Sequence, residues 1–281
     1  MKKYRVCAGM STFNTGNSVC PLDPGKVKAI ILTTSGQKIT TWDAKELEKL
    51  CHADRPSRIF PLKTIVEYAP SGGEAQTSAV GYGPTKITGY SPKTDTWTLE
   101  GADISIKANL AKARNANFDA YFVDDNNVVY GIQDNEGNLA GVPMTGVYPG
   151  GQDFTSSGSN ATLTVTTMFK DYEKFMKDMN VVNCDFDVVE ALKGVVFVDL
   201  VEADGGYKIV EHYGKLDITE YYGAAIAEAS KTTATSVITN ASAVTYAEGV
   251  LTITLSDGEK PKLAAPSVLQ ENGIAGIEQW A

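Results

Sequence analysis

The fold class follows from one stretch of the sequence, residues 118–132, which reads FDAYFVDDNNVVYGI. Two runs rich in aromatic and β-branched residues, 118–123 and 128–132, flank the four polar residues 124–127. Aromatic and β-branched side chains favour strands, whereas Asp and Asn favour the tight turns between them. The stretch therefore predicts an antiparallel β-hairpin.

The chain on either side of this hairpin is also mostly β. Residues 95–100 alternate with period two, which places Trp97 and Leu99 on one face of a strand. Residues 149–160, rich in Gly and Ser, predict a long surface loop. Further strands are predicted at 26–33, 65–68, 161–166, 194–201, 207–213, 244–246 and 250–255.

Helical patterns are few and short. They occur at 43–51, 104–115 and 171–179, and Asp43 can cap the first of them with Glu46 three residues later. The sequence therefore predicts a mainly β, α+β protein. We expect a β-sandwich or barrel-like core with two or three short helices and a small C-terminal β appendage.

Charge divides the chain into three parts. Residues 1–60 carry ten Lys/Arg and five Asp/Glu, residues 61–223 carry 12 and 23, and residues 224–281 carry three and six. We interpret these as a basic N-terminal arm with a strand and a short helix, an acidic β-rich core, and a small β-rich C-terminal appendage. Turn formers dominate residues 1–25, so we expect this stretch to pack poorly on its own subunit and to be ordered by a neighbour.

The overall composition excludes several classes of protein. Hydrophobic residues make up 43% of the 281 residues and charged residues 21%, which is typical of globular proteins and not of disordered chains. A net charge of −9 argues against a strongly basic nucleic-acid-coating protein. No uncharged apolar run approaches the ~20 residues that cross a bilayer, and no export signal is evident. We expect no membrane partner and folding in a cytoplasm with reduced cysteines.

No cofactor or metal site is predicted. Cys7, Cys20, Cys51 and His52 are the one Cys/His group that suggests zinc, but their spacing is unlike the short Cys-x₂₋₄-Cys pairs of structural zinc sites. The acidic stretches 124–127 and 134–138 do not fit a helix–loop–helix calcium loop, and both lie between predicted strands. Ordinary hairpin turns explain them.

The case for an enzyme is weak. His212 with Asp217 and a serine could in principle form a nucleophile–base arrangement, but no Gly-x-Ser-x-Gly motif places the serine. No Gly-rich stretch is followed by Gly-Lys-Ser/Thr, as a phosphate loop requires. We therefore assign no catalytic, cofactor-binding or metal-binding residue and predict a protein that is not an enzyme.

Aromatic residues leave a second class of function open. Trp42, Trp97, Trp280 and 13 tyrosines could build a face on which sugars stack. In β-proteins such side chains more often pack in cores and across strands. A carbohydrate-binding β-module is therefore an alternative, and the missing export signal counts against it.

Two groups of residues resemble virion proteins of tailed phages that infect gut Bacteroides, in particular the crAss-like group. The resemblance spans about residues 10–200, as a pattern of loosely spaced residues and not as a sharp motif. It is carried by Phe13-Asn14-Thr15-Gly16, Cys20 and Val27-Lys28-Ala29-Ile30-Ile31-Leu32, and by Trp97-Thr98-Leu99-Glu100-Gly101, Leu110, residues 118–124 and Val129-Tyr130-Gly131.

The resemblance implies a structural protein of the virion tail or neck, without catalytic residues. Such proteins form homo-oligomeric rings or a tail tube around the DNA conduit, next to other tail, neck or portal proteins. The chain would be assembled in the host cytoplasm and reside in the virion. A capsid auxiliary or fibre-anchoring protein of the same virion is the alternative.

The wall of a DNA conduit must not bind phosphates tightly. Phosphates are repelled by acidic groups, whereas rows of Lys or Arg would retain DNA by counterion release. Genomic DNA is therefore expected to pass without sequence-specific binding. The polar stretches 124–127, 134–138 and 149–160 are the candidates to face the channel or a neighbouring subunit.

Overall fold

The computed structural model describes residues 3–4, 24–101, 103–231, 234–256 and 260–280. Two compact units divide the chain. The first comprises residues up to Leu47 together with Ile59–Leu192, and the second comprises Glu48–Arg58 together with the chain from Lys193 onward. Both are built on mainly antiparallel sheets with short helices, and the pair β14–β20 in the second unit is parallel. The predicted mainly β, α+β fold class is therefore confirmed.

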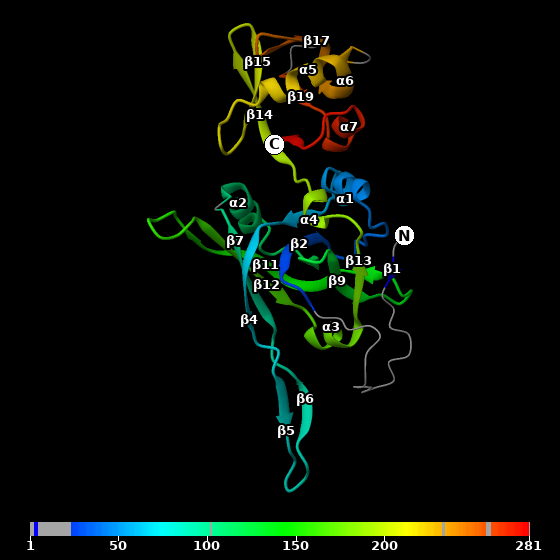
Figure 1. Ribbon diagram of the computed structural model, residues 1–281. Helices are drawn as coiled ribbons and strands as arrows, with labels where there is room; N and C mark the ends of the chain where they lie inside the picture. Colours follow the sequence, from blue (N-terminus) through cyan, green and yellow to red (C-terminus); the bar gives the residue numbers. More distant parts are fainter. Residues whose placement is uncertain (1–2, 5–23, 102, 232–233, 257–259, 281) are drawn as a thin grey trace. The chain divides into compact units, whose positions relative to one another are not determined.

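The first unit is organised by an 11-stranded sheet in which neighbouring strands are antiparallel (Figure 1). Strand β8 pairs with β2 along one edge, and along the other edge it pairs first with β11 and then with β9. The sheet therefore splits into two branches at β8. Its strands are β1 (Lys3–Tyr4), β2 (Val27–Thr34), β3 (Phe60–Leu62), β4 (Ile65–Ser71), β7 (Thr94–Glu100), β8 (Phe118–Asp124), β9 (Val128–Gln133), β10 (Leu139–Ala140), β11 (Val142–Asp153), β12 (Thr162–Phe169) and β13 (Met179–Asn183).

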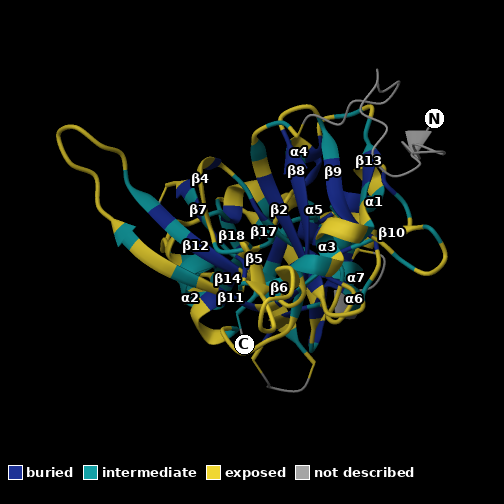
Figure 2. Ribbon diagram, turned by 90° about the horizontal axis from the view of Figure 1, so that it is seen from below, coloured by how far each residue is buried: buried dark blue, intermediate teal, exposed yellow. Residues whose placement is uncertain are grey.

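The predicted 118–132 hairpin, β8 and β9, lies at the centre of this sheet. Residues 119–124 of β8 and 29–33 of β2 are buried without interruption, and Figure 2 draws both strands in dark blue. An unbroken buried run means that both faces of a strand are covered. The Phe122 ring contacts Trp97 at 5.5 Å and Phe169 at 6.1 Å between ring centroids, which joins the two branches of the sheet through one aromatic core.

Short helices fill the connections of the first unit. Asp103 and Asp171 accept hydrogen bonds from backbone N–H groups of the first turns of α2 and α3, as N-cap residues do. The three predicted helices are present, although α2 ends three residues earlier than expected. The helices are α2 (Ile104–Lys112), α3 (Tyr172–Asp178), α4 (Val188–Ala191) and α1 (Ala44–Cys51), which the unit boundary divides after Leu47.

The second unit has a five-stranded sheet in the order β17-β18-β15-β14-β20. Side chains from the sheet and from α5, α6 and α7 share one apolar core. The segment 48–58 is held to this unit by Arg58, whose Nη1 lies 2.5 Å from Glu278 Oε2. Its elements are β14 (Val196–Ala203), β15 (Gly206–Glu211), α5 (Thr219–Ser230), α6 (Ala234–Val237), β16 (Ile238–Thr239), β17 (Ala241–Ala247), β18 (Val250–Leu255), β19 (Lys262–Leu263), α7 (Pro266–Glu271) and β20 (Ile277–Gln279).

The compact units divide the chain differently from the charge pattern. The hairpin at 194–213, which the charge pattern groups with the acidic core, pairs with β18 and β20 and lies in the second unit. The composition change after Gly223 falls inside α5, because an Ala-rich run is a good helix former and not a linker. Three helices, absent from the predicted appendage, therefore accompany its strands.

The basic N-terminal stretch is described only in part. Lys3 and Tyr4 form β1, which pairs with Val182 and Asn183 of β13 in the same chain. Residues 5–23, on which most of the prediction about this stretch depends, lie outside the described residues. Within the described chain, no helix has the length and apolar character needed to cross a membrane.

His52 makes the stability of the second unit depend on pH. The side chain is 1% exposed, and neither ring nitrogen makes a hydrogen bond within the described chain. Burial lowers the pKa of His52 below its usual value of 6.5, although Glu48 and the backbone of Lys193 and Gly194 favour the charged ring.

Below pH 6.5 the unfolded chain therefore binds a proton at His52 that the folded chain does not bind. The free energy of unfolding consequently decreases as the pH falls. We expect the free energy of unfolding to decrease below pH 6.5 by at most about 1.4 kcal/mol per pH unit from this group. Urea titrations between pH 7.5 and 5 measure it, and His52→Leu should flatten the dependence. An unchanged slope in His52→Leu would contradict the assignment.

Candidate functional site

Two strands of the first unit carry threonine at every second position. Residues 94–98 of β7 read TDTWT and residues 162–166 of β12 read TLTVT. Successive side chains of a strand point to opposite faces. Trp97 and Val165, which face each other across the two strands, are buried in the core, so the threonines occupy the opposite, outward side. These threonines are partly exposed except Thr166, which is 7% exposed.

The strand register aligns these threonines in rows. Thr96 lies opposite Thr166 and Thr98 lies opposite Thr164. The Oγ1 atoms of Thr96 and Thr166 are 3.5 Å apart. Gly150 of β11 lies beside this array, and a Cβ there would be 2.4 Å from Thr164 Oγ1. A glycine is therefore required for the close approach of β11 to the threonine rows.

We call the outward side of β11, β12, β7 and β4 the hydroxyl face. Its charged positions are all acidic: Glu67, Glu100 and Asp153. No Lys or Arg occurs at its outward positions, all of which belong to the described chain. The face consists of Gly146, Tyr148, Gly150 and Asp153 of β11, Thr162, Thr164, Thr166 and Met168 of β12, Thr94, Thr96, Thr98 and Glu100 of β7, and Glu67, Ala69 and Ser71 of β4.

The four strands end in two unpaired edges. Among the described residues, β4 pairs with β7 alone, and β11 has no strand on its second edge beyond Met144. Unpaired edges present free backbone N–H and C=O groups to other chains. The hydroxyl face is thus bounded on both sides by strands that can accept a further strand.

A hairpin arm, residues 72–93, extends from the same strands. It contains the two-stranded sheet of β5 (Ala75–Ser78) and β6 (Lys86–Tyr90), and Figure 1 shows it reaching away from the main sheet of its unit. Residues 75–85 carry no charge, yet Val80 is 90% exposed and Tyr82 is fully exposed. An isolated two-stranded hairpin is marginal in water, so this arm is suited to packing against another molecule.

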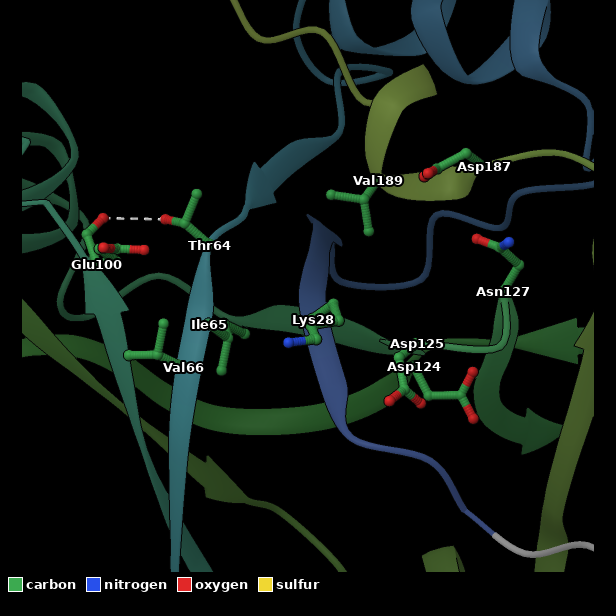
Figure 3. A pocket seen from close by; sticks show the side chains of 10 residues that line it. All are labelled: Lys28, Thr64, Ile65, Val66, Glu100, Asp124, Asp125, Asn127, Asp187 and Val189. Atoms are coloured by element: carbon green, nitrogen blue, oxygen red, sulfur yellow. Dashed lines mark hydrogen bonds between the residues drawn. The ribbon is translucent and has the colours of Figure 1, made fainter.

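The turn 124–127 borders a pocket of about 390 Å³ (Figure 3). Asp124 is 1% exposed and accepts hydrogen bonds from the backbone N–H groups of Gly25, Asn126 and Val128 and from the Tyr130 hydroxyl. Its carboxylate is therefore occupied in organising the turn. Figure 3 places the turn on one side of the pocket and the start of β4 on the other, with Lys28 between them.

The stretches predicted to face a channel do not gather on one surface. The turns 124–127 and 134–138 lie at opposite ends of β9, about 20 Å apart at the usual strand rise. Asp134 is bound to Lys38 at 2.6 Å, which together with two backbone N–H groups lowers the pKa of Asp134 to about 2. The expected loop 149–160 is shorter, because β11 continues to Asp153 and β12 begins at Thr162.

His212 and Asp217, the possible nucleophile–base pair of the sequence analysis, have different partners in the structure. His212 Nδ1 lies 3.0 Å from both carboxylate oxygens of Asp199, not beside Asp217. Asp217 instead binds Lys208 at 2.8 Å and the Thr219 hydroxyl at 2.6 Å, and these contacts lower its pKa to about 2.

Of the four Cys and His residues that could suggest a zinc site, Cys7 and Cys20 lie outside the described residues. Cys51 is buried next to His52 at the end of α1. Within the part of the chain that the structure describes, no three His, Cys, Asp or Glu side chains gather in a way that could hold a metal ion.

The three tryptophans do not form a common exposed face. Trp42 and Trp97 are 2% exposed and belong to the core of the first unit. Trp280, in the second unit, stacks on His212 with ring centroids 4.5 Å apart and meets the edges or faces of Phe197 and Tyr213. The tryptophan platform that a sugar-binding interpretation needs is therefore not assembled from these residues.

No protein-family model matches the chain, and no curated protein matches it by sequence. Among solved structures, it is similar to a chain of the anti-feeding prophage cap, described as the AFP tube terminating cap, with 9% identity and a TM-score of 0.26 over 62% of this chain and all of that one. A chain of the six-fold symmetrised AFP baseplate is similar with 7% identity and a TM-score of 0.26, over 60% of this chain and all of that one. Likenesses this distant do not establish a shared fold.

Proposed function

We propose that this protein is a non-enzymatic structural subunit of a phage tail or neck, which self-assembles into a ring or tube through which DNA passes. The resemblance of residues 10–200 to virion proteins suggests the class of assembly. The hydroxyl face is the observation that carries the proposal. It supplies what a conduit wall requires, a broad sheet surface with hydroxyls, some carboxylates and no cations.

The charge argument is quantitative. Each phosphate contacted by Lys or Arg adds about 0.9 to the log–log salt slope of DNA binding, through release of counterions. A wall of threonines makes no such contact, and Glu67, Glu100 and Asp153 repel phosphates. Duplex DNA can therefore move along such a wall without being retained.

The unpaired edges support closure by further copies of the chain. Strands β11, β12, β7 and β4 alternate in direction, so β4 runs opposite to β11. The β11 edge of a second copy would therefore meet β4 in the antiparallel sense. Repeating this contact gives a head-to-tail interface, which closes into a ring when the rotation between copies is a whole fraction of a turn.

The arm provides a second contact in this proposal. Its exposed apolar side chains Val80, Tyr82 and Ile87 would be removed from water against a neighbouring copy. The arm and the two edges belong to the same unit, so one compact unit carries all the surfaces that a ring of copies needs.

The experiment is to image the purified protein by electron microscopy and to measure its mass by light scattering across concentrations. We expect rings or tubes with the hydroxyl face toward the lumen. The triple variant Val80→Ser/Tyr82→Ser/Ile87→Thr should stay folded and lose assembly. The control Leu216→Ser/Tyr221→Ser, which removes equally exposed apolar side chains from the second unit, should assemble normally.

Two results would overturn the proposal. One is a monomer at every concentration, both alone and in particles. The other is a ring whose hydroxyl face points outward, which would favour a capsid auxiliary or fibre-anchoring protein.

A further inference from the structure

The root of the arm is a joint and not a continuous ladder. The β4–β7 pairing ends at Ser71 and Thr94, and the β5–β6 pairing begins at Ala75 and Tyr90. Gly72 and Gly73 lie between them with φ values of 74° and 84°. The Ser91 N–H donates to the Glu74 carbonyl oxygen at 2.9 Å, so backbone pairing resumes directly beyond the two glycines. At the interruption itself, the direction of the hairpin depends on the side chains around it.

Backbone and side chains approach closely at this joint. A Cβ on Gly72 would lie 1.9 Å from the carbonyl oxygen of Pro92, and one on Gly73 would lie 2.8 Å from the Tyr172 ring. The stem of Lys93 also passes Gly73, 3.1 Å from that Cβ position. Two glycines are therefore needed for the strands and α3 to meet here.

A buried ion pair occupies the same place. Lys93 is 7% exposed, Asp95 is 3% exposed, and Lys93 Nζ lies 2.6 Å from Asp95 Oδ1. The Tyr68 hydroxyl donates to Asp95 at 3.2 Å. Lys93 Nζ also lies 6.0 Å from the Tyr68 ring centroid and 5.9 Å from that of Tyr172, within cation–π range of both.

The pair connects the elements that could move relative to one another. Tyr68 belongs to β4, Asp95 belongs to β7, and Lys93 precedes β7 at the base of the arm. Tyr172 belongs to α3, and its ring also meets Tyr90 of the arm at 6.4 Å between centroids. The Lys93 carbonyl oxygen accepts the Phe169 N–H at 3.0 Å, which fixes Lys93 to the body. A change of arm direction would therefore move Gly73 and Tyr90 against the Lys93 stem and the Tyr172 ring.

Stability does not explain why the pair is there. Burying two charges costs desolvation that their attraction repays only in part, and apolar replacements of similar volume are often as stable. What an ion pair adds is a requirement for one geometry. We propose that Lys93 and Asp95 are positioning residues that hold the arm in one direction before it meets any partner.

The test compares arm direction in two doubly substituted proteins. Spin labels on unnatural amino acids at Ser78 in the arm and Asn115 in the body report their separation by pulsed electron resonance. Labelled protein is diluted into excess unlabelled protein, so that distances within one chain are measured whether or not the protein assembles. The apolar variant is Lys93→Met/Asp95→Leu, and the control is Lys177→Met/Glu173→Leu, which removes an exposed ion pair on α3.

We expect one narrow distance distribution in the wild type and the control, and a broad one in the apolar variant with an unchanged thermal unfolding midpoint. The single variant Asp95→Asn should unfold at a lower temperature, because it leaves Lys93 buried without its counter-charge. A narrow, unshifted distribution in the apolar variant would overturn the proposal. A large decrease in the thermal unfolding midpoint of the apolar variant would also overturn it, since the pair would then stabilise the fold and not set the direction of the arm. Neither outcome depends on ring formation, which the separate imaging experiment decides.

Discussion

Lysine introduced at both Thr98 and Thr164 is expected to turn an assembly that ignores duplex DNA into one that retains it. These residues lie opposite each other on the hydroxyl face, and wild-type protein should show no measurable duplex affinity at physiological salt. Each new phosphate contact should add about 0.9 to the slope of log affinity against log salt. Because every copy in a ring presents the same two lysines, the slope should rise by several units in the assembled form.

The control is a matched threonine pair. Thr245 and Thr252 also face each other across two strands, but in the second unit. Lysine at both positions adds the same charge and the same like-charge pair on a sheet. Equal, salt-sensitive binding by both variants would mean that charge anywhere on the surface suffices, and the hydroxyl face would lose its role. Tight binding by the wild type would count against a conduit altogether.

The second large effect is expected in stability. Asp124→Ala should lower the free energy of unfolding of the first unit by about 3 kcal/mol, because three part-buried N–H donors and one buried hydroxyl lose a charged acceptor. The donors are the N–H groups of Gly25, Asn126 and Val128, at 2.9 to 3.0 Å, and the Tyr130 hydroxyl at 2.7 Å. Denaturant titration with tryptophan fluorescence measures the change, since Trp42 and Trp97 are both buried in this unit.

Asp125 offers the matched comparison one residue further on. It is exposed, and its carboxylate accepts the Lys26 N–H at 3.0 Å. Asp125→Ala should therefore cost less than about 1 kcal/mol. Equal losses in the two variants would show that the turn depends on overall charge and not on the buried carboxylate.

Local patterns predicted the central hairpin and the helices α1, α2 and α3, but not β3, β11, β13 or α4 of the first unit. The 118–132 hairpin needed only its side chains and turn residues. The caps Asp103 and Asp171 became evident only in the structure. The sequence also contains the threonine runs of the hydroxyl face, TDTWT and TLTVT. The period-two alternation was interpreted only for the face that carries Trp97 and Leu99. That the two threonine runs form adjacent rows depends on the register of strands about 70 residues apart, which no local pattern specifies.

The arm and the unit boundary could not be predicted for a related reason. Residues 75–90 have weak alternation and several glycines, so they resemble a loop, and an exposed hairpin carries no buried face to reveal it. The second unit is assembled by long-range pairing, with Val196 of β14 beside Ile277 of β20. Only the three-dimensional pairing shows that residues 194–213 belong with the end of the chain.

The ion pair of Arg58 with Glu278 has a consequence for the order of events during synthesis. Its partners are 220 residues apart, yet both belong to the second unit. A ribosome that adds about 5 to 20 residues per second makes Glu278 roughly 10 to 40 s after Arg58. During that interval the strands of the first unit can emerge and pair, while the rest of the unit to which residues 48–58 belong has not yet been translated. The first unit therefore has time to fold before the residues that complete the second unit have been made.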